Sequence, residues 1–280
     1  GCCGILEQLH SSDNPFMEKE PWKFSAEKAA VIKRFLRLRH RLVPWLYSQN
    51  HCFAAKNEML LRPMYFDSPQ DRAAYHASNQ YMLGDCMTVC PVTQPMDRAA
   101  QLAPTKVYLP DGVWTDFFTG DRYTGGRELN MYRPLDLIPV LVKAGGILPM
   151  DGDEIPKNGV LLPDHLLVRC FAAADGEALL IEDNGKLPND PAYNMAETQI
   201  YMHCGEGLQI VIDPVKGERM LIPADRRYTV EIYGIGNESP NMCSCGYTAS
   251  YVRVPVPEPV NPITVPDALY GAILELISAF

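Results

Sequence analysis

Short β-strand patterns separated by tight-turn residues constrain the fold of this chain more than any other feature. Between residues 59 and 149 the strand-like runs include Met59–Phe66, Lys106–Leu109 and Val113–Phe118, the last two joined by Pro110-Asp111-Gly112, and a short helix is expected over residues 71–82. The 20 glycines and 24 prolines of the 280-residue chain supply many such turns. Strand signals spaced by about 8–12 residues are typical of antiparallel sandwiches and barrels. The sequence therefore predicts a mainly β fold.

A second strand-rich section follows Asp151–Gly159, a stretch of Asp, Gly and Pro that is typical of a linker. Its strands are expected at residues 166–172, 178–182, 199–203, 208–211 and 228–233. We therefore expect one β domain over residues 58–150 and a second over 151–280. The second domain should end in an extended, proline-broken tail after Tyr251, with a last amphipathic helix capped by Asp267.

A helix is expected before the strands. Ser25 can cap it, and apolar residues then recur at helical spacing up to about Ser48: Ile32, Phe35, Leu36, Leu42, Val43 and Leu46. Pro44 should kink or interrupt its last turns, because proline lacks the backbone N–H that the helix needs. The lysines and arginines off this stripe suit a solvated helix face.

Charge and cysteine spacing exclude several classes of protein. Asp and Glu number 34 against 25 Lys and Arg, which disfavours nucleic acid and anionic membranes as partners. No apolar run approaches the ~20 residues that span a bilayer, and no secretory signal is visible at the start. The nine cysteines form no C-x-x-C pair, so we expect no metal, no cofactor and buried reduced thiols in a cytoplasmic protein.

General catalytic motifs are also absent from the sequence. It has no glycine-rich phosphate loop, no H-E-x-x-H and no G-x-S-x-G, and its six histidines are scattered. From composition and spacing alone, the chain is a strand-rich globular protein of unassigned chemistry.

Three groups of motifs along residues 10–185 are more specific. The first is His10-Ser11-Ser12, Lys19-Glu20-Pro21-Trp22 and Leu38–Ser48. The second is Arg62-Pro63-Met64, Gln80–Asp85 and Cys90-Pro91-Val92. The third is Val107–Asp116, Ile138-Pro139-Val140 and Gly145–Pro149, with Ile181–Gly185 further on. In this order they resemble the C-terminal part of glycoside hydrolase family 31, which contains α-glucosidases and α-xylosidases of carbohydrate metabolism.

The resemblance implies a fold and an activity. Residues 1–57 would be the end of the catalytic (β/α)8 barrel with its last helix, residues 58–150 a proximal antiparallel β-sandwich and residues 151–280 a distal one. Family members hydrolyse the O-glycosyl bonds of α-glucoside oligosaccharides with retention, using an Asp nucleophile and an Asp acid/base whose carboxyl groups lie about 5–5.5 Å apart. The resemblance therefore implies a glycoside hydrolase.

The catalytic pair itself is not matched. The acidic residues include Asp13, Glu20, Asp67, Asp85 and Asp116, and none of them lies in either catalytic motif. A whole (β/α)8 barrel needs ~250 residues, and only its last unit fits before the β sections. We therefore assign no catalytic residue and expect a C-terminal fragment that is inactive alone, with the N-terminal barrel of the same enzyme as its partner.

His10 is the one position that inherits a site role from the resemblance. The family has an R-x-H motif whose histidine hydrogen-bonds sugar hydroxyls, so His10 is a candidate substrate-binding residue. Gln8 stands where the family has arginine. The alternative is that His10 is an exposed residue near the terminus.

The aromatic residues of the motifs allow two interpretations. Trp22, Trp45, Tyr108 and Trp114 can stack on a sugar ring or pack inside the protein. We expect packing, with a core between residues 59 and 149 that contains Leu61, Val89, Val107, Leu109, Trp114, Phe117, Ile138, Val140 and Ile147. Sugar stacking would instead suit the alternative function, a non-catalytic β-sandwich module that binds carbohydrate or protein.

Overall fold

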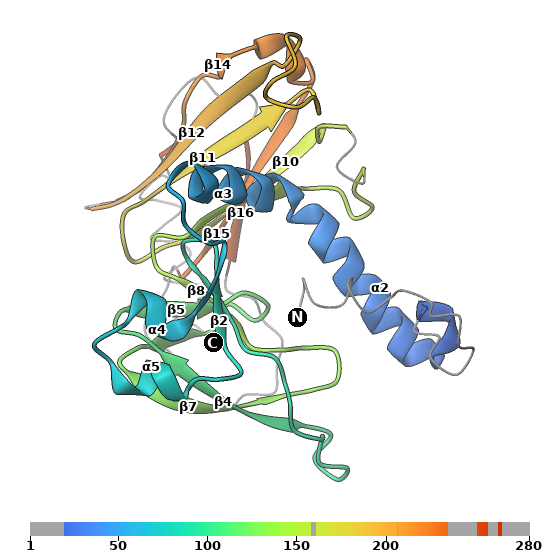
Figure 1. Ribbon diagram of the computed structural model, residues 1–280, viewed down its shortest axis with the longest axis vertical. Helices are drawn as coiled ribbons and strands as arrows, with labels where there is room; N and C mark the ends of the chain where they lie inside the picture. Colours follow the sequence, from blue (N-terminus) through green and yellow to red (C-terminus); the bar gives the residue numbers. More distant parts are fainter. Residues whose placement is uncertain (1–19, 158–160, 206, 235–250, 257–262, 265–280) are drawn as a thin grey trace.

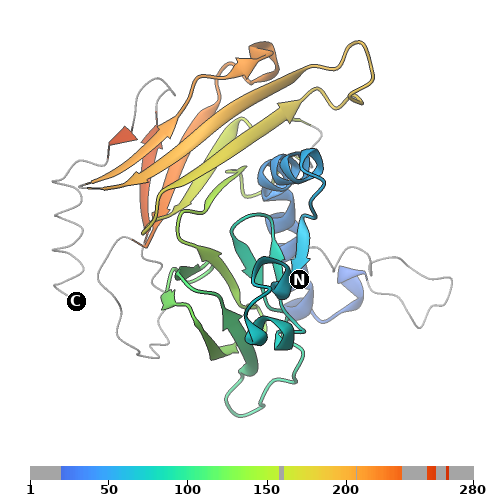
Figure 2. The same cartoon turned by 60° about the vertical axis from the view of Figure 1, so that its left-hand side comes forward.

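The computed structural model describes residues 20–157, 161–205, 207–234, 251–256 and 263–264. The description begins with a 3-10 turn, η2 (Pro21–Lys23), and two helices, α2 (Ala26–Arg41) and α3 (Val43–Ala55). Two β-rich units follow and lie one above the other, with α3 packed beside the point where they meet (Figure 1, Figure 2). The described residues are mainly β with a few helices, as predicted, and no sheet among them closes into a barrel.

The first unit contains a six-stranded sheet and a separate two-stranded ribbon. The sheet has the order β1-β2-β3-β8-β5-β6, and all of its pairs are antiparallel. Its strands are β1 (Leu61–Pro63), β2 (Tyr81–Leu83), β3 (Met87–Val89), β5 (Val113–Asp116), β6 (Arg122–Thr124) and β8 (Val140–Lys143). The ribbon pairs β4 (Ala103–Leu109) with β7 (Arg127–Arg133), and two short helices, α4 (Met64–Asp67) and α5 (Arg72–His76), connect β1 to β2.

The second unit is made of two sheets that share one core. One sheet has the order β16-β15-β10-β9 and the other β11-β12-β13-β17, with β14 beside β12. Their elements are β9 (Ile147–Asp151), β10 (His165–Phe171), β11 (Gly176–Asp183), β12 (Met195–Cys204), β13 (Leu208–Ile212), β14 (Lys216–Gly217), η3 (Arg219–Leu221), β15 (Arg227–Tyr233), β16 (Tyr251–Val256) and β17 (Ile263–Thr264). Buried residues of both sheets, such as Val168 and Ile200, form one cluster. The pair β10–β15 is parallel.

The predicted helix is two helices. The α-helical backbone is interrupted at Leu42, and Pro44 lies in the first turn of α3, where its missing N–H costs nothing. The interruption predicted at Pro44 is therefore confirmed. The two helices differ in burial, because α2 buries only Phe35 whereas α3 buries Pro44, Trp45, Ser48, Gln49 and Phe53.

Helix α3 is bonded to both units. The Ser48 hydroxyl accepts the backbone N–H of Ile181 on β11 at 2.8 Å, and Gln49 exchanges two hydrogen bonds with Asp85 beside β2. Gly84 has φ +62°, and a Cβ there would lie 2.7 Å from the Trp45 ring. Only glycine lets the chain pass this close to Trp45 in that conformation. The helix therefore fixes the two units to each other.

Two local predictions in the first unit are wrong. The strand expected over 59–66 stops at Pro63, which lacks a donor for the ladder and precedes α4. The helix expected over 71–82 ends at His76, because Tyr81–Leu83 pair with β1 and β3 instead. Tertiary strand pairing overrides the local helical pattern here.

The predicted core of residues 59–149 is confirmed at seven of nine positions. Leu61 is wrong because β1 is the edge of its sheet and leaves that side chain 46% exposed, and Ile138 is half-buried. Ile147 is buried, but it lies on β9 and packs with the second unit. The remaining six are buried in the first unit: Val89, Val107, Leu109, Trp114, Phe117 and Val140.

Two further findings concern cysteines and membranes. The described cysteines, Cys52, Cys86, Cys90, Cys170 and Cys204, are all free thiols, and burial raises the pKa of Cys90 to about 12. Across the described ranges, the helices are too short or too polar to cross a bilayer.

The contrast between the helices predicts a difference in hydrogen exchange. Most amides of α2 should exchange faster than those of β4 and β5, because α2 projects from the body and buries a single side chain (Figure 1). Amides of α3 should be protected like the strands. Exchange followed by mass spectrometry on the monomer tests this, and protection of α2 equal to that of β5 would contradict it.

Candidate functional site

The candidate residues from the sequence do not meet in one place. His10, the predicted substrate-binding residue, lies outside the described residues, as does Asp13. Trp22 is 76% exposed on η2, whereas Trp45 and Trp114 are each 1% exposed. These positions do not form a shared aromatic surface.

Trp114 and Tyr108 are parts of the core of the first unit. The Trp114 indole Nε1–H donates to the Pro110 carbonyl at 2.8 Å, and its ring belongs to a cluster with Val107 and Leu141. The Tyr108 hydroxyl donates to Asp71 at 2.6 Å, and burial together with this bond raises the pKa of Tyr108 to about 12. Buried rings with satisfied polar groups stabilise the fold and offer no face to a sugar.

Three buried carboxylates are held by arginines. Asp116 forms an ion pair with Arg133, and Glu231 accepts a hydrogen bond from the Arg169 Nε–H at 2.9 Å. Glu182 accepts a bidentate pair of hydrogen bonds from the Arg226 guanidinium at 2.7 and 2.8 Å, and both side chains are at most 3% exposed. A carboxylate enclosed with its arginine cannot reach a glycosidic bond, so these acids are structural.

Candidate catalytic and metal chemistry is limited in the part of the chain that the structure describes. Asp67 is bound by Arg62, and Asp85 by Gln49. Among the described residues no group of His, Cys, Asp or Glu side chains is arranged to hold a metal ion. Of the acidic residues considered from the sequence, Asp67, Asp85 and Asp116 are therefore engaged in contacts that support the fold.

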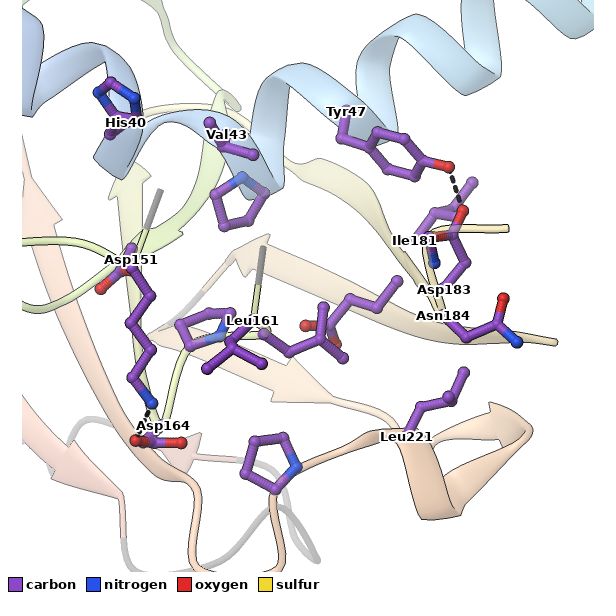
Figure 3. Close-up of a pocket in the computed structure, with 17 residues that line it drawn as sticks. His40, Val43, Tyr47, Asp151, Leu161, Asp164, Ile181, Asp183, Asn184 and Leu221 are labelled. Carbon is purple, nitrogen blue, oxygen red and sulfur yellow. Dashed lines mark hydrogen bonds and ion pairs between the residues drawn. The ribbon is translucent and has the colours of Figure 1, made fainter. Parts of the chain in front are cut away.

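One pocket of about 500 Å³ lies where the helices meet the second unit (Figure 3). The end of α2 and the start of α3 form one wall, and the end of β11 with Asp183 and Asn184 forms another (Figure 3). The remaining wall comes from the segment that connects β9 to β10 and from the loop around η3. This volume is in the usual range for small-molecule sites.

Polar contacts fix the rim of the pocket. The Tyr47 hydroxyl donates to the Asp183 carboxylate, which also accepts the Gly185 N–H at 2.8 Å. Burial and this carboxylate raise the pKa of Tyr47. Asp164, which binds Lys157, lies on the opposite side of the pocket from Tyr47 (Figure 3). The His40 Nδ1–H donates to the Leu36 carbonyl at 2.9 Å, which leaves Nε2 as an acceptor when the ring is neutral.

Two of the sequence motifs contribute residues to this pocket, although the sequence alone did not predict it. Tyr47 and Asp183 are in separate motifs 136 residues apart, Leu38–Ser48 and Ile181–Gly185. The sequence contains both motifs but does not indicate that they lie close together, and only the folded chain brings them into contact.

Comparison with known proteins identifies the first unit. Residues 57–148 match the family model described as the glycosyl hydrolase family 31 C-terminal domain. The chain carries a family 31 C-terminal domain. The second group of sequence motifs and the third group up to Leu148 fall within this match, so the resemblance stated from the sequence is confirmed.

Relatives extend the family 31 similarity beyond that domain. The α-xylosidase of Saccharolobus solfataricus is 33% identical over 184 residues, which cover 65% of this chain and 24% of that protein. A family 31 α-xylosidase structure from Xanthomonas citri, 24% identical, has a TM-score of 0.66 and covers 88% of this chain and 26% of its own. This chain therefore spans about a quarter of the length of these relatives and matches their C-terminal portion.

A third relative was solved with a sugar. The structure of a cycloalternan-forming enzyme from Listeria monocytogenes in complex with a pentasaccharide substrate is 25% identical, with a TM-score of 0.61. The match covers 80% of this chain and 20% of that one.

Proposed function

We propose that this chain is the C-terminal, β-rich part of a retaining family 31 α-glycosidase of the α-glucosidase type, and that its role is to support the catalytic barrel. Residues 1–57 would end the (β/α)8 barrel, residues 58–150 would be the proximal β-sandwich and residues 151–280 the distal one. The reduced thiols of the buried strands suit a cytoplasmic enzyme. α-Glucoside oligosaccharides would be the substrates.

The observation that carries this proposal is the position of the helices together with the family match. Helix α3 is bonded to both β units through buried groups, whereas α2 buries only Phe35 and contacts the units mainly through partly exposed ion pairs such as Arg34–Asp136 and Arg37–Glu154 (Figure 1). Ile32 and Leu36 on α2 are half-buried and belong to none of the three core clusters of the described residues. Half-buried apolar side chains outside these clusters suit packing against another part of the enzyme.

The catalytic step itself is assigned to carboxylates outside these 280 residues. Retaining hydrolysis needs a nucleophile and an acid/base about 5–5.5 Å apart. The buried carboxylates Asp116, Glu182 and Glu231 are held by arginines and cannot serve. The alternative is a non-catalytic module that binds carbohydrate or protein. Its use of the four aromatic residues for sugar stacking is disfavoured, because Trp45, Trp114 and Tyr108 are buried and only Trp22 is exposed.

A graft tests the supporting role. Residues 20–280 would replace the matching C-terminal segment of the Saccharolobus α-xylosidase, and hydrolysis of an aryl α-xyloside would be measured. We expect the graft to be active and the enzyme truncated before that segment to be inactive. A graft that is soluble and folded by circular dichroism, yet inactive, would overturn the proposal.

A matched pair of variants locates the contact. In the graft, Leu36→Glu should reduce activity strongly, because it puts a charge where α2 is expected to pack on the barrel. Lys33→Glu changes an exposed position of the same helix and should leave activity unchanged. Equal effects of the two variants would show that this stripe does not face the barrel.

A further inference from the structure

The pocket between the helices and the second unit has the properties of a built binding site. Its volume of about 500 Å³ would accommodate a ligand of one or two sugar rings. Prolines from three separate segments, Pro44, Pro163 and Pro223, line it. Because the proline ring fixes φ, these walls lose little conformational freedom when a ligand binds.

The charges of the lining exclude anionic ligands. Asp151, Asp164, Glu182 and Asp183 line the pocket, against the single lysine Lys157. Lys157 is bound to Asp164, and Glu182 is paired with Arg226, which does not line the pocket. Asp183 has no ion-pair partner among the described residues, so a phosphate or carboxylate ligand would meet repulsion.

The arrangement of groups favours a ligand with both C–H faces and hydroxyls. Leu161, Leu221 and Val43 give the pocket apolar walls, and Tyr47 adds a 42% exposed ring at the rim (Figure 3). Acceptors stand at the edges of this apolar surface, namely the carboxylate of Asp183, the amide oxygen of Asn184 and Nε2 of neutral His40.

The acceptors are held in place before any ligand arrives. The Asn184 Nδ2 donates to the Ala192 carbonyl at 2.6 Å, and its Oδ1 accepts the Lys186 N–H. Asp183 is held by the Gly185 N–H and the Tyr47 hydroxyl. Fixed acceptors lower the entropic cost of binding a polyol.

We propose that this pocket is a carbohydrate-binding site that takes one or two pyranose rings of a neutral glycan. The sugar hydroxyls would donate to Asp183 and Asn184, and a C–H face of the ring would pack on Tyr47 and Leu161. The choice of α-linked glucans as the glycan rests on the proposed function. The site needs none of the catalytic carboxylates and works by binding alone.

The test measures binding of maltose, maltotriose and isomaltose to the 280-residue chain by saturation-transfer NMR and calorimetry. We expect saturable binding that weakens by about tenfold or more in Tyr47→Ala and in Asn184→Ala. Tyr132→Ala removes a tyrosine that is 58% exposed on β7, outside the pocket, and should bind like the parent. Unfolding midpoints of the variants check that each remains folded.

Each other outcome overturns the proposal. No saturable binding of these glycans by the folded chain would do so, and so would binding that Tyr47→Ala and Asn184→Ala leave unchanged. Spermidine that binds more tightly than the sugars and displaces them would identify a cation site instead. The binding assay involves no hydrolysis. An inactive α-xylosidase graft would therefore count against the proposed function without changing the interpretation of the binding measurements.

Discussion

Replacing Trp114 with alanine is expected to lower the free energy of unfolding by about 3–5 kcal/mol, the usual cost of removing a large core aromatic. Trp114 is 1% exposed, packs with Val107 and Leu141, and donates its indole N–H to Pro110. The alanine variant would leave both a cavity and an unpaired Pro110 carbonyl in the family 31 domain. Chemical denaturation and the midpoint of thermal unfolding measure the loss.

Trp22→Ala is the matched control. Trp22 is the same residue type at 76% exposure, so its removal should change stability by no more than about 0.5 kcal/mol. If Trp114→Ala were as stable as Trp22→Ala, Trp114 would not belong to the core, and the assignment of this ring as structural would fail.

Breaking the buried pair of Glu182 and Arg226 should have an effect of similar size. Arg226→Met leaves the Glu182 carboxylate uncompensated at 3% side-chain exposure, which typically costs about 3–5 kcal/mol. The double variant Glu182→Met/Arg226→Met removes both charges, so it should lose less than the sum of the single losses. Urea unfolding of the three variants gives the coupling directly.

An exposed ion pair provides the comparison for this cycle. Lys106 and Glu128 form a 2.6 Å pair on the β4–β7 ribbon, with side chains 63% and 38% exposed. Lys106→Met should cost between about 0 and 1 kcal/mol, because water screens the pair. Should Arg226→Met cost no more than Lys106→Met, the pair at Glu182 is solvated in solution, contrary to the structure.

The sequence predicted those parts of the fold that local chemistry controls. The turn at Pro110-Asp111-Gly112 is where expected, and Gly112 has φ +122°, which favours glycine. Alternation on β4 placed Val107 and Leu109 in the core. Strand β2 at residues 81–83 was missed, because its pairing with β1 and β3 overrides the local helical pattern of this segment.

The candidate site was beyond sequence reasoning for the same reason. Ser48 and Ile181 are 133 residues apart, yet the bond between them joins α3 to β11 beside the pocket. The parallel pair β10–β15 was also unpredictable, since its strands have other strands between them in the chain. His10 remains a prediction, since it lies outside the described residues.

The most direct test of the central claim, that this chain supports a catalytic barrel and carries no catalytic pair of its own, is an assay of the purified 280-residue chain on aryl α-glucosides and aryl α-xylosides. We expect hydrolysis at the background rate of buffer for both substrates, because no acidic residue of the sequence lies in a match to either catalytic motif and retaining hydrolysis needs both carboxylates. Hydrolysis above background that co-purifies with the chain, and that is lost on substitution of one of its own carboxylates, would contradict the account.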